Sequence, residues 1–347
     1  MITPVLMDET DEQEALRETV IAILDKHADS EAVRKISEDP EVEYDARLWE
    51  RLATELGATL LLVPEDQDGL GMGWQEASIV LEELGRRLVP SPLLSTLVAH
   101  GALAFAEAPQ LADLAAEATP IAVVLDGVTA SGDTVSGAAK AVIGAGSADQ
   151  LLVIADGEVY LVAADAAGVN VTRRASLDQT RPLSEVSFDG AAAERIGGAE
   201  VAGRLRQLLR SALATDSAAG ADRILEITVE YLKVRQQFGQ PIGKFQALKH
   251  RAADLLVEVQ GAAATAQYAV KALVDGDEDV DTITTMAKAV AADAYYATAA
   301  DAIQLHGGIG FTWEHDCHLY FKRAKANQWL GETNSALRAK LREAIAG

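Results

Sequence analysis

The chain of 347 residues is long enough for about two or three domains with hydrophobic cores of their own. Its 30 Lys and Arg residues are outnumbered by 53 Asp and Glu residues, which gives a formal net charge of −23. Because the electrostatic field of this negative charge repels polyanions, nucleic acid and anionic membrane surfaces are excluded as partners. An anionic ligand would need a local cluster of Arg and Lys. The single cysteine, Cys317, cannot form an intrachain disulfide, which fits a reducing compartment.

The N-terminal segment, MITPVLMDETDEQEAL, lacks the basic region and the apolar core of a secretory signal peptide. No apolar run in the chain approaches the roughly 20 residues that a membrane-spanning helix needs. Hydrophobic residues make up 49% of the composition, so we expect an ordinary globular, soluble protein of the cytoplasm.

Residues 1–118 show the periodicity of amphipathic helices. In one stripe, Leu16, Val20 and Leu24 recur at the spacing of successive helical turns. Further along, two helical patterns are separated by Pro90, which cannot continue a helix. We therefore predict an N-terminal α-helical domain over this range.

The composition changes at Pro120. Short runs rich in Val, Ile and Leu then alternate with Asp-Gly and Gly-Asp pairs. The pair Asp156-Gly157 lies between two such runs and is a strong signal for a two-residue β-hairpin turn. We predict a small antiparallel β domain over residues 119–198.

Helical periodicity returns in residues 199–347, where many alanines indicate closely packed helices. The predicted helices are 200–236, 245–275, 280–306 and 314–345. The predicted fold class is therefore α+β and multidomain. It comprises an N-terminal helical domain, a small antiparallel β domain and a C-terminal four-helix bundle.

A short polar and aromatic segment separates the first two helices of the predicted bundle. It contains Arg235, two Gln residues, Phe238 and Gly239. An Arg in the last turn of a helix interacts favourably with the helix dipole, which is one interpretation. Alternatively, the guanidinium group binds a phosphate through two parallel hydrogen bonds, with Phe238 packed beneath a ring. The pattern alone leaves both interpretations open.

Three segments, in order, resemble motifs of the acyl-CoA dehydrogenase family, flavoproteins that desaturate acyl thioesters. They are LVPEDQDGLG at residues 62–71, VRQQFGQPIGKFQALKHRAADL at 234–255 and QLHGGIGFTW at 304–313. The resemblance spans nearly the whole chain and implies the same order of domains. It also implies FAD as cofactor, an acyl-CoA substrate and assembly as a dimer of dimers. The implied electron acceptor is an electron-transfer flavoprotein, or dioxygen as in related oxidases.

The resemblance also implies which residues bind the ligands. Seven residues match family positions that contact FAD, and most of these positions contact the flavin of a neighbouring subunit. They are Arg235, Phe238, Gln304, Gly307, Gly308, Thr333 and Ser335. Glycines let the backbone approach a diphosphate closely, although Gly307-Gly308 also fits a simple helix stop. Arg210 matches a residue near the acyl-CoA phosphates and is the predicted substrate-binding residue.

Desaturation next to a thioester needs a carboxylate base with a pKa near neutrality and donors for the thioester oxygen. In the family the base occupies one of two positions, and this chain has Gly331 at the first and Leu209 at the second. Neither base is therefore in place. Asp216, two helical turns after Leu209, and Glu332, one residue after Gly331, are the candidate bases. The remaining interpretation is that another polypeptide supplies the base.

The predicted β domain supports that remaining interpretation. The family usually lines its flavin with an acidic, Gly-rich segment and a segment containing Trp and a hydroxyl residue. Here residues 118–121 run straight into a strand, and residues 140–146 contain neither Trp nor a hydroxyl group. We therefore favour a hetero-oligomer, as in family members that act on steroid side-chain thioesters. The alternatives are a self-sufficient homotetramer using Asp216 or Glu332, and a non-catalytic scaffold on the same fold.

One further group of residues has the composition of a metal site. His315, Cys317 and His318 are close in sequence, but their segment resembles the family without any metal, so no metal site is predicted. The cations that follow are interpreted as a solvated helix face, with the alternative that they help to bind a CoA phosphate: Lys322, Arg323 and Lys325.

Overall fold

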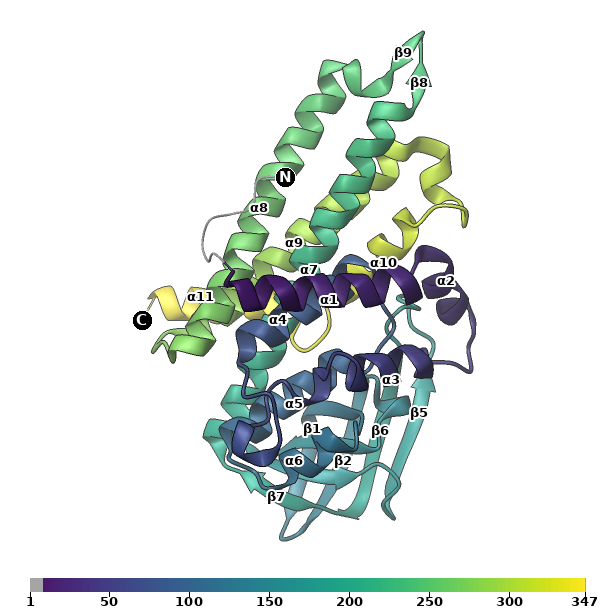
Figure 1. Cartoon of the computed structure of the whole chain (residues 1–347). Helices are drawn as coiled ribbons and strands as arrows, with labels where there is room; N and C mark the ends of the chain where they lie inside the picture. Colours follow the sequence, from purple (N-terminus) through teal and green to yellow (C-terminus); the bar gives the residue numbers. More distant parts are fainter. Residues whose placement is uncertain (1–8, 347) are drawn as a thin grey trace.

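The structure, a computed structural model, describes residues 9–346 and consists of short helices, a β-sheet and a long helical bundle (Figure 1). The first half of the N-terminal segment considered above, residues 1–8, lies outside the described residues. Within the described part, no helix combines the length and the apolar character that crossing a membrane requires.

The N-terminal part consists of α-helices joined by short loops and 3-10 turns. They are α1 (Asp11–His27), α2 (Ser30–Glu38), α3 (Ala46–Thr54), η1 (Ala58–Leu60), η2 (Glu65–Gln67), α4 (Trp74–Arg86), α5 (Leu93–Phe105) and α6 (Gln110–Ala116). A capping box starts α1, because the Thr10 hydroxyl accepts a hydrogen bond from the Gln13 N–H (3.3 Å). In return, the Gln13 side chain accepts one from the Thr10 N–H (3.1 Å).

The strands form one seven-stranded sheet in the order β5-β6-β2-β1-β3-β4-β7. They are β1 (Ile121–Ser131), β2 (Thr134–Ile143), β3 (Gln150–Ala155), β4 (Glu158–Ala163), β5 (Val169–Arg174), β6 (Leu183–Ala192) and β7 (Glu194–Gly197), with η3 (Ala145–Ser147) after β2. The hairpin predicted at Asp156-Gly157 is confirmed, since both residues have positive φ and β3 pairs antiparallel with β4.

One ladder of the sheet differs from the prediction. β1 and β3 run parallel, with Ile121 opposite Gln150, whereas an antiparallel sheet was expected. The reason is topological: β2 returns antiparallel beside β1, and the chain then crosses to the other side of β1 through η3. β3 therefore starts at the same end of the sheet as β1.

The C-terminal part is built on very long helices. They are α7 (Ala199–Val234), α8 (Gln246–Asp275), α9 (Val280–His306), α10 (Cys317–Asn327) and α11 (Asn334–Ala346). Between them lie the hairpin β8 (Gln236–Gln237) and β9 (Gln240–Pro241), η4 (Ile242–Lys244) and η5 (Gly307–Phe311). The single helix predicted over 314–345 is wrong, because α10 ends at Asn327 and Gly331 adopts a φ of +67°, which a helix excludes.

The predicted fold class is confirmed, and one hydrophobic core links its parts. Leu97 of α5, Ile121 and Leu152 of the sheet and Leu205 of α7 belong to the same buried cluster. Helices give way to strands between α6 and β1, and strands give way to helices between β7 and α7. The division of the chain into domains at these points stays a prediction.

A buried histidine in α5 makes the stability of the protein depend on pH. His100 is fully buried, and burial lowers its pKa to about 4. The pKa of His100 is lower in the folded protein than the unfolded value of 6.5. Neutral His100 therefore contributes fully to the free energy of unfolding above pH 6.5, and this contribution is lost as the pH falls through 4. In urea titrations at pH 7 and pH 4.5, we expect His100→Phe to reduce the acid-induced loss of unfolding free energy by about 2–3 kcal/mol. The exposed control His250→Phe should behave like the wild type. An unchanged pH dependence in His100→Phe would contradict this expectation.

Candidate functional site

A cavity of about 230 Å³ lies between the sheet and the bundle. Leu209 on α7 and Gly331, between α10 and α11, both line it. A Cβ added at Gly331 would lie 3.5 Å from the Leu209 side chain, so the two positions are neighbours. The two positions at which the resemblance predicts a base therefore both face one cavity.

The walls of this cavity offer little acid–base chemistry. The segment predicted to lack flavin-lining residues contributes Lys140 through Ile143, on the β2 side. Asp126 provides the carboxylate among the lining residues, and it is an exposed residue in the middle of β1. A base that removes a weakly acidic α-proton needs a buried carboxylate with a raised pKa, and the described walls of this cavity do not hold one.

The first candidate base, Asp216, is held in a buried ion-pair network. It accepts hydrogen bonds from Arg181 (2.6 Å), Arg323 (3.0 Å) and Asn327 (2.7 Å). Burial alone would raise the pKa of Asp216, but the two guanidinium groups outweigh it, and the pKa is lowered. A carboxylate with a lowered pKa and fully engaged oxygens takes up a proton poorly, so this environment argues against Asp216 as the base.

The second candidate base, Glu332, is also occupied by cations. One of its carboxylate oxygens accepts a hydrogen bond from Arg210 (2.6 Å), and the other contacts Lys340. Burial raises its pKa, but hydrogen bonds from Arg210 and Lys340 lower it overall. The side chain does not line the cavity. Arg210 in turn is 4% exposed and donates to Asp281 (2.7 Å), so it is not free to bind a substrate phosphate in this conformation.

A buried lysine that the sequence analysis missed fixes the loop carrying Glu332. Lys288 of α9 donates to the Glu332 carbonyl oxygen (2.6 Å) and to Asn334 Oδ1 (3.1 Å). It is 1% exposed, and burial lowers its pKa to about 8. The sequence did carry a signal, because Lys288 lies among alanines on an otherwise apolar stretch of helix. These contacts hold the loop so that Gly331, and not Glu332, faces the cavity.

The residues matched to FAD contacts fall into two groups. We call the exposed group the cofactor tip: Arg235, Phe238, Gln304, Gly307 and Gly308. Its two segments lie together at one end of the bundle, because the Tyr231 ring stacks on His306 at 4.3 Å and its hydroxyl donates to the His306 carbonyl oxygen. Thr333 and Ser335 lie at the start of α11, where the Thr333 hydroxyl accepts a hydrogen bond from the Ala336 N–H.

The cofactor tip has the features of a surface that another molecule covers. Phe238 is 91% exposed, which is unusual for a large apolar side chain. Among the described residues, Arg235 forms no ion pair. A Cβ added at Gly307 or Gly308 would meet nothing within 4 Å, so the backbone there is open to close approach. A free guanidinium, an exposed ring and open backbone together fit a diphosphate joined to an aromatic system.

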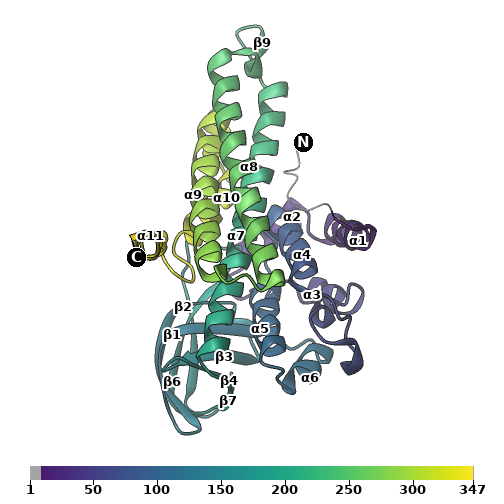
Figure 2. The ribbon, with the colours of Figure 1, turned by 90° about the vertical axis from the view of Figure 1, so that its left-hand side faces the viewer.

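The cofactor tip and the cavity lie far apart along α7. Figure 2 shows the β8–β9 hairpin at one end of α7 and the sheet at the other. Leu209 and Arg235 are separated by 26 residues of almost continuous helix, which corresponds to about 39 Å at about 1.5 Å per residue. One flavin therefore cannot contact both within a single chain.

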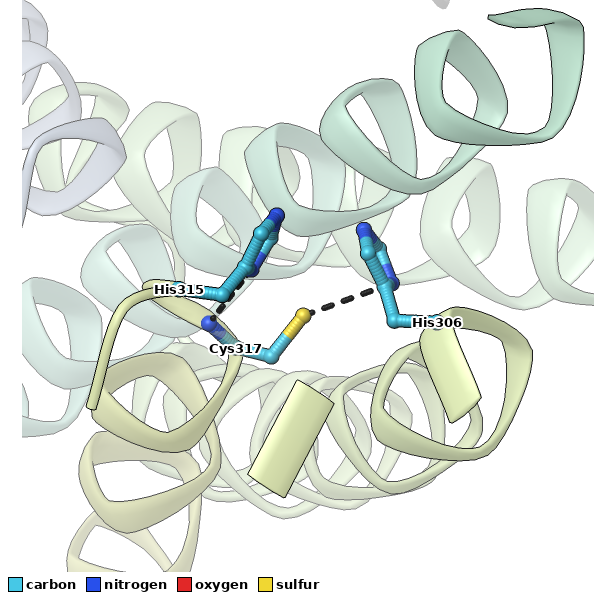
Figure 3. A group of neighbouring side chains, drawn as sticks. All are labelled: His306, His315 and Cys317. Carbon is cyan, nitrogen blue, oxygen red and sulfur yellow. Dashed lines mark hydrogen bonds between the residues drawn. The ribbon is translucent and has the colours of Figure 1, made fainter. Parts of the chain in front are cut away.

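The structure brings together a histidine and cysteine group that the sequence only partly indicated. His306, His315 and Cys317 lie with one potential ligand atom of each within 4.8 Å of the others (Figure 3). His306 Nδ1 lies 2.7 Å from the Ala302 carbonyl oxygen and 3.4 Å from Cys317 Sγ, so neighbouring groups already engage this nitrogen. The prediction of no metal site stays a prediction.

The interpretation of Arg323 as part of a solvated face is wrong. Its side chain is buried and donates to Asp178 (2.6 Å) and to Asp216. Lys322 and Lys325 are partly exposed, as expected. A signal was present in the sequence, because Tyr320, Arg323 and Asn327 recur at helical spacing and share the buried face of α10.

Comparison with known proteins decides the family. Residues 10–114 match the model of the acyl-CoA dehydrogenase N-terminal domain, and residues 197–346 match that of the C-terminal domain. The chain belongs to the acyl-CoA dehydrogenase family. Members of this family are FAD-dependent oxidoreductases.

Similar members include proteins named as acyl-CoA dehydrogenase IpdE2. That of Mycolicibacterium smegmatis is 38% identical over 330 residues, covering 95% of this chain and 97% of the relative. Among solved structures, a variant of the Tcur3481-Tcur3483 steroid ACAD has a TM-score of 0.91 and 30% identity, covering 97% of this chain and 98% of that one. The ChsE4-ChsE5 complex from Mycobacterium tuberculosis has a TM-score of 0.90 and 28% identity, with 98% and 99% covered.

The reactivity of Cys317 tests the histidine and cysteine group. The thiol is fully buried, and burial raises its pKa to about 12. A reagent therefore cannot reach the sulfur, and the reactive thiolate form is hardly populated. We expect no reaction with a thiol reagent at pH 8 in the native protein, and one thiol per chain after unfolding in guanidinium chloride. We also expect no zinc in the purified protein. One equivalent of tightly bound zinc would show that the group is a metal site.

Proposed function

We propose that the chain is one subunit of a hetero-oligomeric acyl-CoA dehydrogenase that uses FAD to form an α,β double bond in a steroid-derived acyl-CoA. In this proposal a related subunit holds most of the flavin and supplies the catalytic base. The observation that carries it is the contrast between an exposed cofactor tip and a cavity whose two base positions, Leu209 and Gly331, carry no carboxylate. The names of the similar structures, a steroid ACAD and a complex of two proteins, support the substrate and the assembly.

The cofactor tip is the contribution of this chain to the active site of the partner. Arg235 provides the fork of donors that binds a diphosphate through two parallel hydrogen bonds, and Phe238 packs against the ring. The glycines at 307 and 308 let the backbone lie close to the adenosine diphosphate. When bound, FAD accepts the hydride from the substrate. An electron-transfer flavoprotein is the proposed acceptor of the electrons.

Purification alone and with a related subunit tests the assembly. Flavin absorbance and acyl-CoA turnover that appear only after co-expression support the proposal. Flavin and turnover in the chain alone would support a self-sufficient homotetramer, with Asp216 or Glu332 as base. No flavin under either condition would support a non-catalytic scaffold and would contradict the proposal.

Within the co-expressed complex, Arg235→Ala measures the role of the cofactor tip. Loss of charge-assisted hydrogen bonds to the diphosphate costs about 1.5–3 kcal/mol, so we expect about 10- to 100-fold weaker FAD binding. Dialysis followed by flavin absorbance measures the retained cofactor. The control Lys233→Ala removes another exposed cation two residues earlier, one that pairs with Glu230, and should retain FAD as the wild type does. Equal retention in both variants would contradict the role of Arg235.

Glu332→Gln tests whether this chain supplies a base. In the complex we expect turnover within about threefold of the wild type, because the side chain points to Arg210 and not into the cavity. A general base contributes about 10²–10⁴-fold, so the two outcomes are well separated. Single-turnover reduction of the flavin measures the chemical step directly. A loss of 100-fold or more would assign the base to Glu332 and to this chain.

A further inference from the structure

Both segments of the cofactor tip begin where a long helix ends. Arg235 follows the last residue of α7, and its N–H donates to the Tyr231 carbonyl oxygen one turn earlier (2.9 Å). Gly307 follows the last residue of α9, and its N–H donates to the Gln304 carbonyl oxygen. Helix ends fray, because their last turns make fewer hydrogen bonds than the middle of a helix. Two such ends bind one ligand together only if other contacts hold them in register.

Tyr231 joins the two helix ends. Its ring centroid lies 4.3 Å from that of His306, with 26° between the two ring planes. Its hydroxyl donates to the His306 carbonyl oxygen (3.2 Å), which belongs to the peptide unit that leads into Gly307. The backbone of the same residue accepts the hydrogen bond from Arg235. One tyrosine therefore contacts both halves of the cofactor tip.

The His306 ring is also held by contacts from other elements. Its Nδ1 lies 2.7 Å from the Ala302 carbonyl oxygen, one turn earlier in α9. The His315 ring lies 4.3 Å from the His306 ring, as the two side chains in Figure 3 show. Asp316, the next residue, accepts a hydrogen bond from Arg34 of α2 (2.8 Å). The ring on which Tyr231 packs is therefore fixed to α9 and, through the loop before α10, to α2.

We infer that Tyr231 and His306 are positioning residues that set the spacing between the Arg235 guanidinium group and the backbone at Gly307. The inference rests on the proposed function, in which these two groups bind the same diphosphate. Groups that bind one ligand must be held to within about 0.5 Å of the productive geometry. Tyr231 and His306 act only through the groups that they hold. Loss of their contact weakens FAD binding and leaves the chemical step, which the partner performs, unchanged.

Two substitutions of Tyr231 in the co-expressed complex test this inference. Tyr231→Phe keeps the ring and removes the hydroxyl, and loss of one neutral hydrogen bond should raise the dissociation constant of FAD about 2- to 10-fold. Tyr231→Leu also removes the ring contact and should raise it about 10- to 100-fold. Equilibrium dialysis with flavin absorbance measures the dissociation constant. At saturating FAD, single-turnover reduction of the flavin by acyl-CoA should keep the wild-type rate in both variants.

Matched controls separate positioning from general stability. Tyr320→Phe removes a hydroxyl that donates to another backbone carbonyl oxygen, that of Arg86 (2.7 Å). Tyr296→Leu breaks another pair of aromatic rings, Tyr296 and Phe321, whose centroids are 5.4 Å apart. Neither pair includes a residue of the cofactor tip, so both controls should bind FAD as the wild type does. A loss of FAD in the controls equal to that in the Tyr231 variants would overturn the inference.

A double variant shows whether Tyr231 acts through Arg235. If it does, adding Tyr231→Leu to Arg235→Ala weakens FAD binding by less than the product of the two single effects. Effects that multiply fully would overturn the inference, and so would a slower flavin reduction at saturating FAD. If Tyr231→Leu does not assemble, the comparison of Tyr231→Phe with Tyr320→Phe decides.

The inference and the proposed function fail in different ways. If Arg235→Ala weakens FAD binding and neither Tyr231 variant does, only the positioning role is refuted. If Arg235→Ala also binds FAD as the wild type does, or if the complex holds no FAD, the proposed function is refuted and the inference with it.

Discussion

The length and rigidity of α7 set the constraint on which the rest of the site depends. Its 36 residues carry the cavity near one end and the cofactor tip at the other, so the two cannot meet in one chain. Most of its length is buried against α4, α5, α8 and α9, which keeps it from bending to bring them together. In the proposed function, a flavin that contacts the cofactor tip of this chain therefore lies mainly in a partner subunit.

The second constraint on the structure is a network of buried charged side chains. Arg323, Asp216, Asp178 and Arg181 are removed from water, which is favourable only because each oxygen and guanidinium is matched. Such a network adds little net stability compared with an apolar core, but it is costly to break. It therefore fixes α7, α10 and the approach to β6 relative to one another.

Two buried cations hold the loop between α10 and α11, which contains Gly331 and Glu332. Lys288 and Arg210 hold it from two sides, one through the backbone and one through Glu332. Gly331 takes a backbone conformation that most residues avoid, which turns the loop past the cavity without placing a side chain in it. The acid one residue later is thus consumed in ion pairs.

Local signals were sufficient for the order of the elements. Helical spacing, the change of composition at Pro120 and the Asp156-Gly157 turn act within a few residues, so the sequence alone determined the fold class and this hairpin. Motif resemblance predicted the cofactor tip in the same local way, and its role stays a prediction. Only the tertiary structure decided that β1 and β3 are parallel and that Arg323 is buried. It also decided that Asp216 pairs with Arg181 and Arg323, which lie 35 and 107 positions away in the sequence. The pKa of a carboxylate and the groups that it can contact depend on the residues that pack around it. The spacing of residues along the chain does not determine which residues those are.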